Sequence, residues 1–127
     1  MANLLDTYTF IWFVEGDARL SQGAKQVIEK NGVDNYLSIA SLWEIAIKIS
    51  LGKLELKSPF SRILEEIVKN GFNLLPISFE DTLTLSTLPF YHRDPFDRII
   101  ISQCISRNMV VLSKDQAFDR YPITVVW

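Results

Sequence analysis

Acidic side chains occur at five places where the chain leaves a predicted strand or begins a predicted helix. They are Asp6, Glu44, Asp94, Asp97 and Asp115. Carboxylates held close together repel one another, so such a cluster either raises its pKa values or recruits a cation. Oxygen ligands suit Mg²⁺ or Mn²⁺, which can activate a water for in-line attack on a phosphodiester. The acids therefore indicate metal-assisted phosphodiester hydrolysis, provided that the fold brings them together.

Short apolar segments alternate with helical patterns along the whole chain. Strands are predicted over residues 3–5, 36–39, 72–77, 109–112 and 123–126. Helices are predicted over residues 7–14, 21–30, 41–51, 59–70, 78–88 and 95–107, with a short helix after residue 115. Pro76 restricts the third strand to a strand end or a sheet edge. We therefore expect an α/β fold, a three-layer α/β/α sandwich with a central, mostly parallel sheet.

In such a fold, the ends of the strands and the starts of the following helices share one edge of the sheet. Ligands bind at this edge, where the order of the strands reverses. Asp6 and Asp115 directly follow predicted strands, and Glu44 lies in the first turn after another. Asp94 and Asp97 open the helix that leads to the strand over residues 109–112. All five acids are therefore expected to face one another.

Each acid also has an ordinary structural use. These uses are an N-cap for Asp6, Asp94 and Asp115, a place beside the helix dipole for Asp97, and a capping box for Ser41-x-x-Glu44. Five independent caps need not lie at one edge of a sheet. Their shared edge therefore favours a site over a set of unrelated caps.

The remaining polar and aromatic residues are less informative. His92, the only histidine, lies in a proline-flanked loop and is expected to form hydrogen bonds there rather than act as a general base. Cys104 is expected in the core, and one cysteine with one histidine excludes a disulfide and the usual zinc sites. Cations that could contact phosphates are Lys48, Lys53, Arg93, Arg98 and Lys114. Aromatic residues expected mainly in the core are Tyr8, Trp12, Phe13 and Trp43.

Length and composition indicate one globular domain over residues 1–127. Hydrophobic residues make up 48% of the chain, which excludes a disordered segment. The net charge of -2 permits a nucleic-acid partner but does not indicate one. The chain has no basic leader segment and no apolar run of membrane-spanning length, so we expect a cytoplasmic protein without membrane association.

Four short motifs follow one another in a recognisable order. They are Leu4-Leu5-Asp6-Thr7, Ser41-x-x-Glu44, Asp94-Pro95-Phe96-Asp97-Arg98 with Ile99-Ile100-Ile101 after it, and Leu112-Ser113-x-Asp115. This order resembles that of PIN-domain ribonucleases. More narrowly, the chain resembles the VapC-type toxins of bacterial type II toxin–antitoxin systems from Asn3 to its C-terminus.

The resemblance implies a metal-dependent endoribonuclease that uses Mg²⁺ or Mn²⁺ and acts as the toxin of a toxin–antitoxin pair. It implies catalytic and metal-binding roles for Asp6, Glu44, Asp97 and Asp115, with Asp94 and Asp119 as secondary candidates. Asp6 and Asp97 are expected to bind the metal directly, and the other two to complete or orient its ligand shell. The implied partners are an RNA substrate, a second copy of the chain and a cognate antitoxin whose C-terminal segment lies over the groove.

Three other functions fit the sequence less well. A phosphatase-like domain would need Asp-x-Asp after the first strand, but position 8 is Tyr. A receiver-like domain would need paired acids at the end of the first strand and a lysine on the last, and neither is present. The alternative from another class is a catalytically silent PIN-fold module that binds a protein partner. Acids at all four implied positions argue against it.

Overall fold

The central sheet consists of five short strands that all run parallel. The computed structural model describes residues 1–127, with β1 (Asn3–Leu5), β2 (Asn35–Ser38), β3 (Asn73–Leu75), β4 (Val110–Leu112) and β5 (Thr124–Val126). Their order is β3-β2-β1-β4-β5. The predicted α/β fold is confirmed. As Pro76 required, β3 is an edge strand and ends before the proline.

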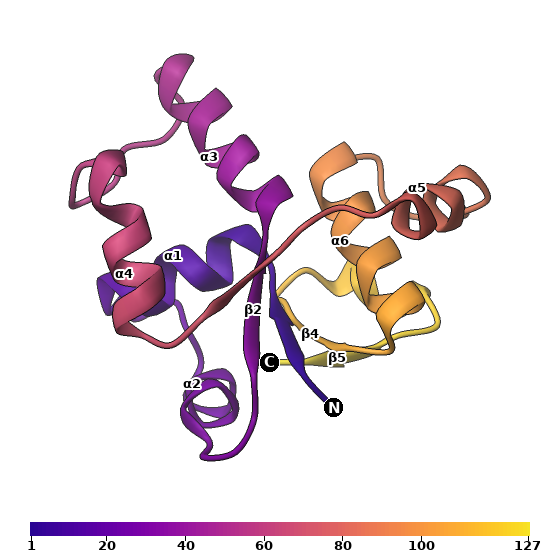
Figure 1. Ribbon diagram of the computed structural model, residues 1–127, viewed down its shortest axis with the longest axis horizontal. Coiled ribbons are helices and arrows are strands. Elements are labelled where there is room, and N and C mark those ends of the chain that lie inside the picture. Colours follow the sequence, from indigo (N-terminus) through magenta and orange to yellow (C-terminus); the bar gives the residue numbers. More distant parts are fainter.

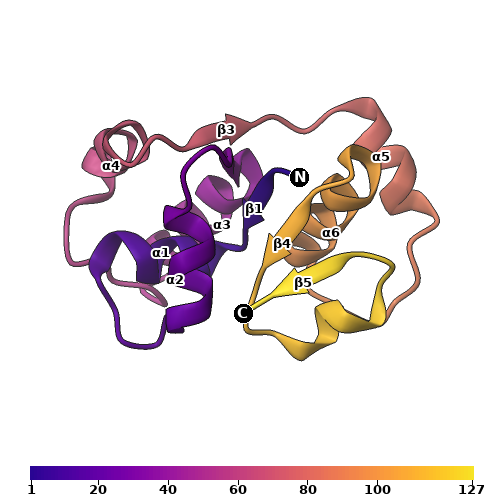
Figure 2. The same ribbon diagram turned by 90° about the horizontal axis from the view of Figure 1, so that it is seen from below.

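Helices cover both faces of the sheet, which gives the predicted three layers. They are α1 (Thr7–Glu15), α2 (Gln22–Glu29), α3 (Ile39–Ser50), α4 (Ile63–Lys69), α5 (Phe79–Ser86) and α6 (Pro95–Arg107), with 3-10 turns at Phe60–Arg62 and Gln116–Arg120. The helices α1 to α4 lie on one side of the strands, and α5 and α6 lie on the other (Figures 1 and 2). None of them combines the length and the apolar character needed to cross a membrane.

Neighbouring residues of each central strand are buried against opposite helical layers. Leu4 and Val111 belong to the apolar cluster formed with α5 and α6, whereas Leu5 and Leu112 belong to the cluster formed with α1 to α4. All four side chains are fully buried. This two-sided burial explains why the strands are continuous apolar runs instead of alternating patterns. Cys104 lies in the first cluster, as predicted.

Two predicted helix starts are wrong. The third helix begins at Ile39, because Ser38 ends β2 and its hydroxyl accepts a hydrogen bond from the Ala40 N–H at 3.1 Å. Ser41 is therefore inside α3, and it forms no capping box with Glu44. The helix predicted from Pro59 begins instead with a 3-10 turn and becomes α-helical only at Ile63.

The order of the strands places a crevice between β1 and β4. The chain builds β1, β2 and β3 outward in one direction and then returns to the other side of β1 for β4 and β5. Adjacent crossovers thus leave the sheet in opposite directions at this point, which is where ligands bind in open parallel sheets. The backbone N–H of Asp6 donates to Leu112 O at 3.1 Å, so the ends of the two strands stay joined.

A buried acid fastens α5 to α6, the helix that begins at the crevice. Asp81 completes a capping box with Ser78 and accepts hydrogen bonds from the hydroxyl of Ser106 and, at 3.1 Å, from Arg107 Nη2. Burial alone would raise the pKa of Asp81, but the bonds from Ser106, Ser78 and Arg107 outweigh it and lower that pKa. The carboxylate of Asp81 is therefore charged and fully paired at neutral pH.

Replacing Asp81 with Asn is expected to lower the free energy of unfolding by about 2–4 kcal/mol, because Arg107 loses its charged partner and the capping box is weakened. Urea unfolding at pH 7 measures this loss. Since the pKa of Asp81 is lowered by folding, the stabilising effect of its charge is lost as the pH falls below about 4. The free energies of unfolding of the wild type and Asp81→Asn should then converge.

Glu80→Gln is the matched control for Asp81→Asn, because Glu80 is an exposed acid in the same helical turn. Its effect should stay within about 0.5 kcal/mol. Equal unfolding curves for the two variants at pH 7 would show that the buried contacts of Asp81 do not stabilise the chain.

Candidate metal centre

A polar cleft of about 450 Å³ opens at the crevice between β1 and β4. Its lining consists of Asp6, Tyr8, Trp12, Arg19, Glu44, Lys48, Asp94, Asp97, Lys114 and Asp115. All five acids predicted to face one another are in this set. The acid predicted as a further candidate, Asp119, is exposed on the turn Gln116–Arg120 and does not line the cleft.

Asp6 forms the floor of the cleft where β1 becomes α1. Its Oδ1 accepts a hydrogen bond from the Thr9 N–H at 2.8 Å, so Asp6 is the N-cap of α1. Burial raises the pKa of Asp6, although hydrogen bonds from Ser113 and Thr9 oppose the shift. The carboxylate is thus held in place at a position where its charge is poorly solvated.

Glu44 enters the cleft from α3 and is held by two side chains. Thr7 Oγ1 donates to Glu44 Oε1 at 2.6 Å, and Lys48 Nζ lies 2.6 Å from Oε2. Lys48 also donates to Tyr8 Oη at 3.0 Å. Burial alone would lower the pKa of Lys48, but its bonds to Glu44 and Tyr8 outweigh burial and raise it. Glu44 therefore faces the cleft as one half of a charged pair.

Asp94 and Asp97 have different environments although they lie three residues apart. Asp94 is the predicted N-cap of α6, and its Oδ1 accepts from the N–H groups of Phe96 at 2.8 Å and Asp97 at 3.1 Å. Asp97 has no capping role. Burial, followed by the charges of Asp94, Asp6, Glu44 and Asp115, raises the pKa of Asp97 to about 8. Asp97 is thus a buried acid whose charge is opposed both by poor solvation and by the acids around it.

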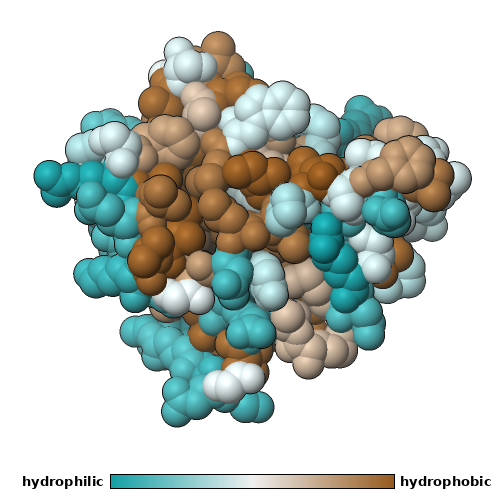
Figure 3. Space-filling view, viewed as in Figure 1, coloured by the Kyte–Doolittle hydropathy of each residue, from teal (hydrophilic) through white to brown (hydrophobic).

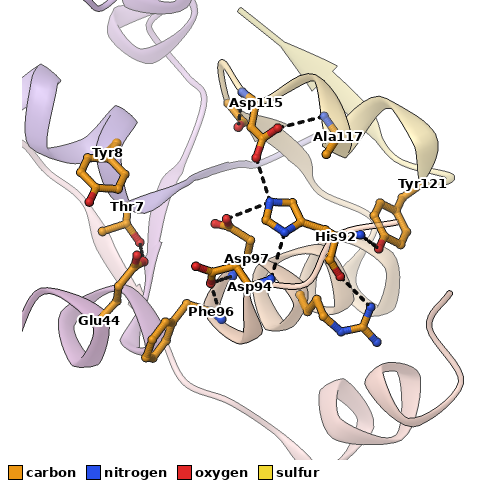
Figure 4. A network of polar contacts seen from close by, with 12 residues as sticks. Thr7, Tyr8, Glu44, His92, Asp94, Phe96, Asp97, Asp115, Ala117 and Tyr121 are labelled. Atoms are coloured by element: carbon orange, nitrogen blue, oxygen red, sulfur yellow. Dashed lines mark hydrogen bonds and ion pairs between the residues drawn. The ribbon is translucent and has the colours of Figure 1, made fainter. Parts of the chain in front are cut away.

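Asp115 lies after β4 and meets a residue that the sequence did not point to. Its Oδ1 caps the 3-10 turn by accepting from the Ala117 N–H at 2.9 Å, while its Oδ2 lies 2.8 Å from His92 Nε2. The same nitrogen is 3.1 Å from Asp97 Oδ2 (Figure 4). His92, Asp97 and Asp115 each place a possible ligand atom within 4.8 Å of the other two. His92 is thus part of the site and not only of its loop.

Of the five predicted cations, two line the cleft and three do not. Lys48 and Lys114 line it, together with Arg19, which had no sequence signal. Lys53 and Arg93 are exposed outside this lining. Arg98 is buried, and its guanidinium donates to the carbonyls of Leu88, Pro89 and His92. The prediction that Arg98 contacts phosphates is therefore wrong, because it holds the loop before α6.

The expectation of core positions is wrong for two of the four aromatic residues. Trp43 is 62% exposed and stands edge-on to Phe96, and Tyr8 is 38% exposed at the cleft. Trp12 also lines the cleft, but it and Phe13 pack against the core as well. Helical spacing does not separate these cases, because it reports which face of the helix a residue lies on and not what covers that face.

The donor set of the cleft fits a hard divalent cation. Four acids from separate segments, Asp6, Glu44, Asp97 and Asp115, offer carboxylate oxygens, which Mg²⁺ and Mn²⁺ prefer. Burial first, and then the charges of the neighbouring acids, raise the pKa of Asp97, which fits a cleft whose negative charges the protein does not fully neutralise. The structure thus brings the predicted quartet together, and the role of each acid as a metal ligand stays a prediction.

Comparison with protein families decides the class of the chain. A family model described as the PIN domain matches residues 4–123. The chain belongs to the PIN-domain family. The matched range includes Asp6, Glu44, Asp94, Asp97 and Asp115, so the whole acidic cleft lies within the PIN domain. None of the curated protein sequences matches the chain.

Solved structures share this PIN fold over nearly the full chain. A chain in VapBC2 from Rickettsia felis, bound to a promoter DNA fragment, has a TM-score of 0.73 at 16% identity, with 98% of this chain and 97% of that chain covered. A chain in DNA-bound VapBC from Salmonella typhimurium has a TM-score of 0.72 at 17% identity, with 98% of this chain and 96% of that chain covered. A chain in a toxin–antitoxin complex from Klebsiella pneumoniae has a TM-score of 0.69 at 19% identity, with 99% of this chain and 97% of that chain covered. Identities this low establish the shared fold alone.

The burial of Asp97 among other acids predicts that removing its charge stabilises the PIN domain when no metal ion is bound. Folding raises the pKa of Asp97 from 3.8 to about 8, so the folded state holds the proton more tightly and stability is lost as the pH rises through this range. Asp97→Asn should therefore raise Tm by about 5 °C at pH 8 in EDTA and have little effect at pH 4. Differential scanning calorimetry at both pH values measures the difference.

Asp119→Asn serves as the control for Asp97→Asn, because it removes the same charge from an exposed position outside the cleft. Its Tm should stay close to that of the wild type at both pH values. A lower Tm for Asp97→Asn at pH 8 would contradict a cost of burying the charge of Asp97 among the other acids.

Proposed function

We propose that this PIN domain is a metal-dependent endoribonuclease and the toxin of a toxin–antitoxin pair. The observation that carries the proposal is the convergence of four acids from separate segments in one cleft at the switch point of the sheet. Membership of the PIN-domain family supports nuclease chemistry at this cleft. The structural matches within VapBC complexes support the toxin role.

The acids would divide the work of holding Mg²⁺ or Mn²⁺. Asp6 and Asp97 would bind the ion directly, because both are poorly solvated and Asp97 is not used as a cap. Glu44 and Asp115 would complete or orient the ligand shell, since each is already fixed by protein donors. When bound, the ion supplies an activated water and neutralises charge on the phosphate. Asp94 keeps the start of α6, and with it Asp97, in place.

The rim of the cleft has groups that suit a single strand of RNA. Arg19 lies 5.1 Å from the centre of the Trp12 ring and Lys114 lies 6.0 Å from it, while Lys48 lies 4.9 Å from the centre of the Tyr8 ring. Cations can contact phosphates, and exposed aromatic rings can stack on unpaired bases. This strip of two rings and three cations stands beside the acids, where a scissile phosphate would have to lie.

A cognate antitoxin and a second copy of the chain are the proposed protein partners. The complexes that contain the structural relatives support the antitoxin. Apolar side chains also gather across the middle of one face of the molecule (Figure 3). Large exposed apolar residues of α3, α4 and the β3–α5 segment include Trp43, Leu64, Val68, Leu74, Ile77 and Phe79. Apolar exposure of this extent is typical of a surface that a partner covers.

Cleavage of a mixed RNA pool tests the proposed enzyme. The purified, antitoxin-free wild type should cleave RNA with Mg²⁺ or Mn²⁺ and should be inactive in EDTA. Asp97→Asn is expected to lower the cleavage rate by about 100-fold or more, because a ligand of the ion is lost. Asp119→Asn should cleave like the wild type, since Asp119 lies outside the cleft.

Two results of this experiment would contradict the proposal. One is cleavage that persists in EDTA or in the Asp97→Asn variant. The other is a folded wild type that cleaves no RNA with either ion, which would favour the catalytically silent interaction module. Circular dichroism of each variant separates loss of activity from loss of structure.

The cations of the rim should contribute to binding and not to chemistry. Arg19→Ala combined with Lys114→Ala is expected to raise KM for a short single-stranded RNA by roughly tenfold and to leave kcat nearly unchanged. The dependence of log affinity on log salt should become shallower by about 0.7 for each phosphate contact removed.

Lys53→Ala is the control for the rim variant, because Lys53 is an exposed lysine outside the lining of the cleft. It should change neither KM nor the salt dependence. A similar rise in KM for Lys53→Ala would mean that RNA binding depends on the overall charge of the protein and not on the cations of the rim.

A further inference from the structure

The imidazole of His92 is held more firmly than its position in a loop suggests. The backbone N–H of His92 donates to Tyr121 Oη at 2.9 Å, and Tyr121 Oη donates to Pro89 O at 2.7 Å. The carbonyl of His92 accepts from Arg98 Nη1 at 3.3 Å, and its ring stands edge-on to Phe118 with 5.7 Å between the ring centres. Tyr121 and Arg98 thus hold the backbone of His92, and Phe118 packs against its ring.

The two ring nitrogens of His92 meet different kinds of partner. Nδ1 faces the backbone N–H of Asp94 at 3.1 Å and accepts a hydrogen bond from it. Nε2 faces Oδ2 of Asp115 at 2.8 Å and Oδ2 of Asp97 at 3.1 Å. Nδ1 cannot carry a proton while it accepts this hydrogen bond, so the proton of the neutral ring must be on Nε2. His92 therefore donates one N–H between two carboxylates.

His92 could serve either as a metal ligand or as a hydrogen-bond donor to the acids, and its tautomer decides between these two roles. The three ligand atoms of His92, Asp97 and Asp115 lie within 4.8 Å of one another, as the ligands of one ion could. A nitrogen that carries a proton has no free electron pair for a metal, however. As long as the Asp94 N–H is bound to Nδ1, the imidazole can orient the acids but cannot join them as a ligand.

We propose that His92 is a positioning residue whose Nε2–H holds Asp97 and Asp115 in the orientation that receives the metal ion, and that it is not itself a ligand. The proposal rests on the proposed metal-dependent function. The contact links α6 to the segment after β4, two parts of the chain that otherwise approach the cleft from different elements (Figure 4). Ala117 holds Oδ1 of Asp115 from the other side, so this carboxylate is fixed at both oxygens.

Nuclear magnetic resonance of the ring nitrogens tests the tautomer without a mutation. His92 is the only histidine, so ¹⁵N-labelled protein gives a single imidazole spectrum. We expect the Nε2–H form in EDTA, and we expect it to persist when Mg²⁺ is added in excess. An Nδ1–H form, or loss of the Nε2 proton on addition of Mg²⁺, would overturn the proposal and make His92 a ligand.

A matched pair of variants tests the positioning role. His92→Gln places an amide N–H near the position of Nε2 and loses the acceptor for Asp94, whereas His92→Asn keeps an acceptor near Nδ1 and loses the donor. Mn²⁺ affinity is measured by electron paramagnetic resonance of the free ion. We expect His92→Asn to weaken Mn²⁺ binding about 10- to 100-fold and His92→Gln to stay within a few-fold of the wild type.

The outcomes separate the failure of this inference from the failure of the proposed function. Equal Mn²⁺ affinity for the wild type, His92→Gln and His92→Asn overturns the positioning role while the metal site stands. The reverse order, with Gln weaker than Asn, overturns it as well. A wild type that binds neither Mn²⁺ nor Mg²⁺ contradicts the proposed function, and the tautomer in EDTA then still decides whether His92 is the donor between the two acids.

Discussion

Repulsion between carboxylates in one cleft is the constraint around which the rest of the structure is arranged. Five acids line the cleft, and burial together with four neighbouring charges raises the pKa of Asp97 to about 8. Without a cation this arrangement costs folding free energy, so the scaffold must be stable enough to impose it. The parallel sheet provides that stability because its central strands bury side chains on both faces, as Leu4 and Leu5 do.

Capping and site formation are one arrangement in this domain and not competing explanations of the acids. Asp6, Asp94 and Asp115 each use Oδ1 to accept backbone N–H groups at the start of a helix or turn, and each also lines the cleft. A carboxylate has two oxygens with about four acceptor positions, so capping leaves Oδ2 for the cleft. The caps thus orient three acids before any ion or substrate arrives, which is the preorganisation that a metal site requires.

The features predicted correctly from the sequence depend on local patterns, and those missed depend on distant contacts. Asp94 could be placed because a cap followed by proline specifies the start of a helix by itself. The pattern Ser41-x-x-Glu44 misled because Ser38, three residues earlier, takes the cap. The role of His92 is not visible in the sequence because Tyr121, 29 residues away, holds its backbone in place. Arg98 looked like a phosphate contact because nothing in a charged residue's spacing reveals that backbone carbonyls surround it.

A cleft that receives both a cation and an anionic strand needs its own charges separated in space. The net charge of -2 gives the chain no general attraction for nucleic acid, so the cations beside the acids must supply it locally. Arg19 and Lys114 lie over the Trp12 ring and form no ion pair with the acids of the cleft. Lys48 is paired with Glu44, and Arg19 is paired at 2.7 Å with Asp17, which lies outside the lining of the cleft. The Trp12 ring therefore keeps the positive charge of Lys114 near the acids without an ion pair to them, and Asp17 holds Arg19 beside the same ring, so the acids of the cleft stay open to a metal ion.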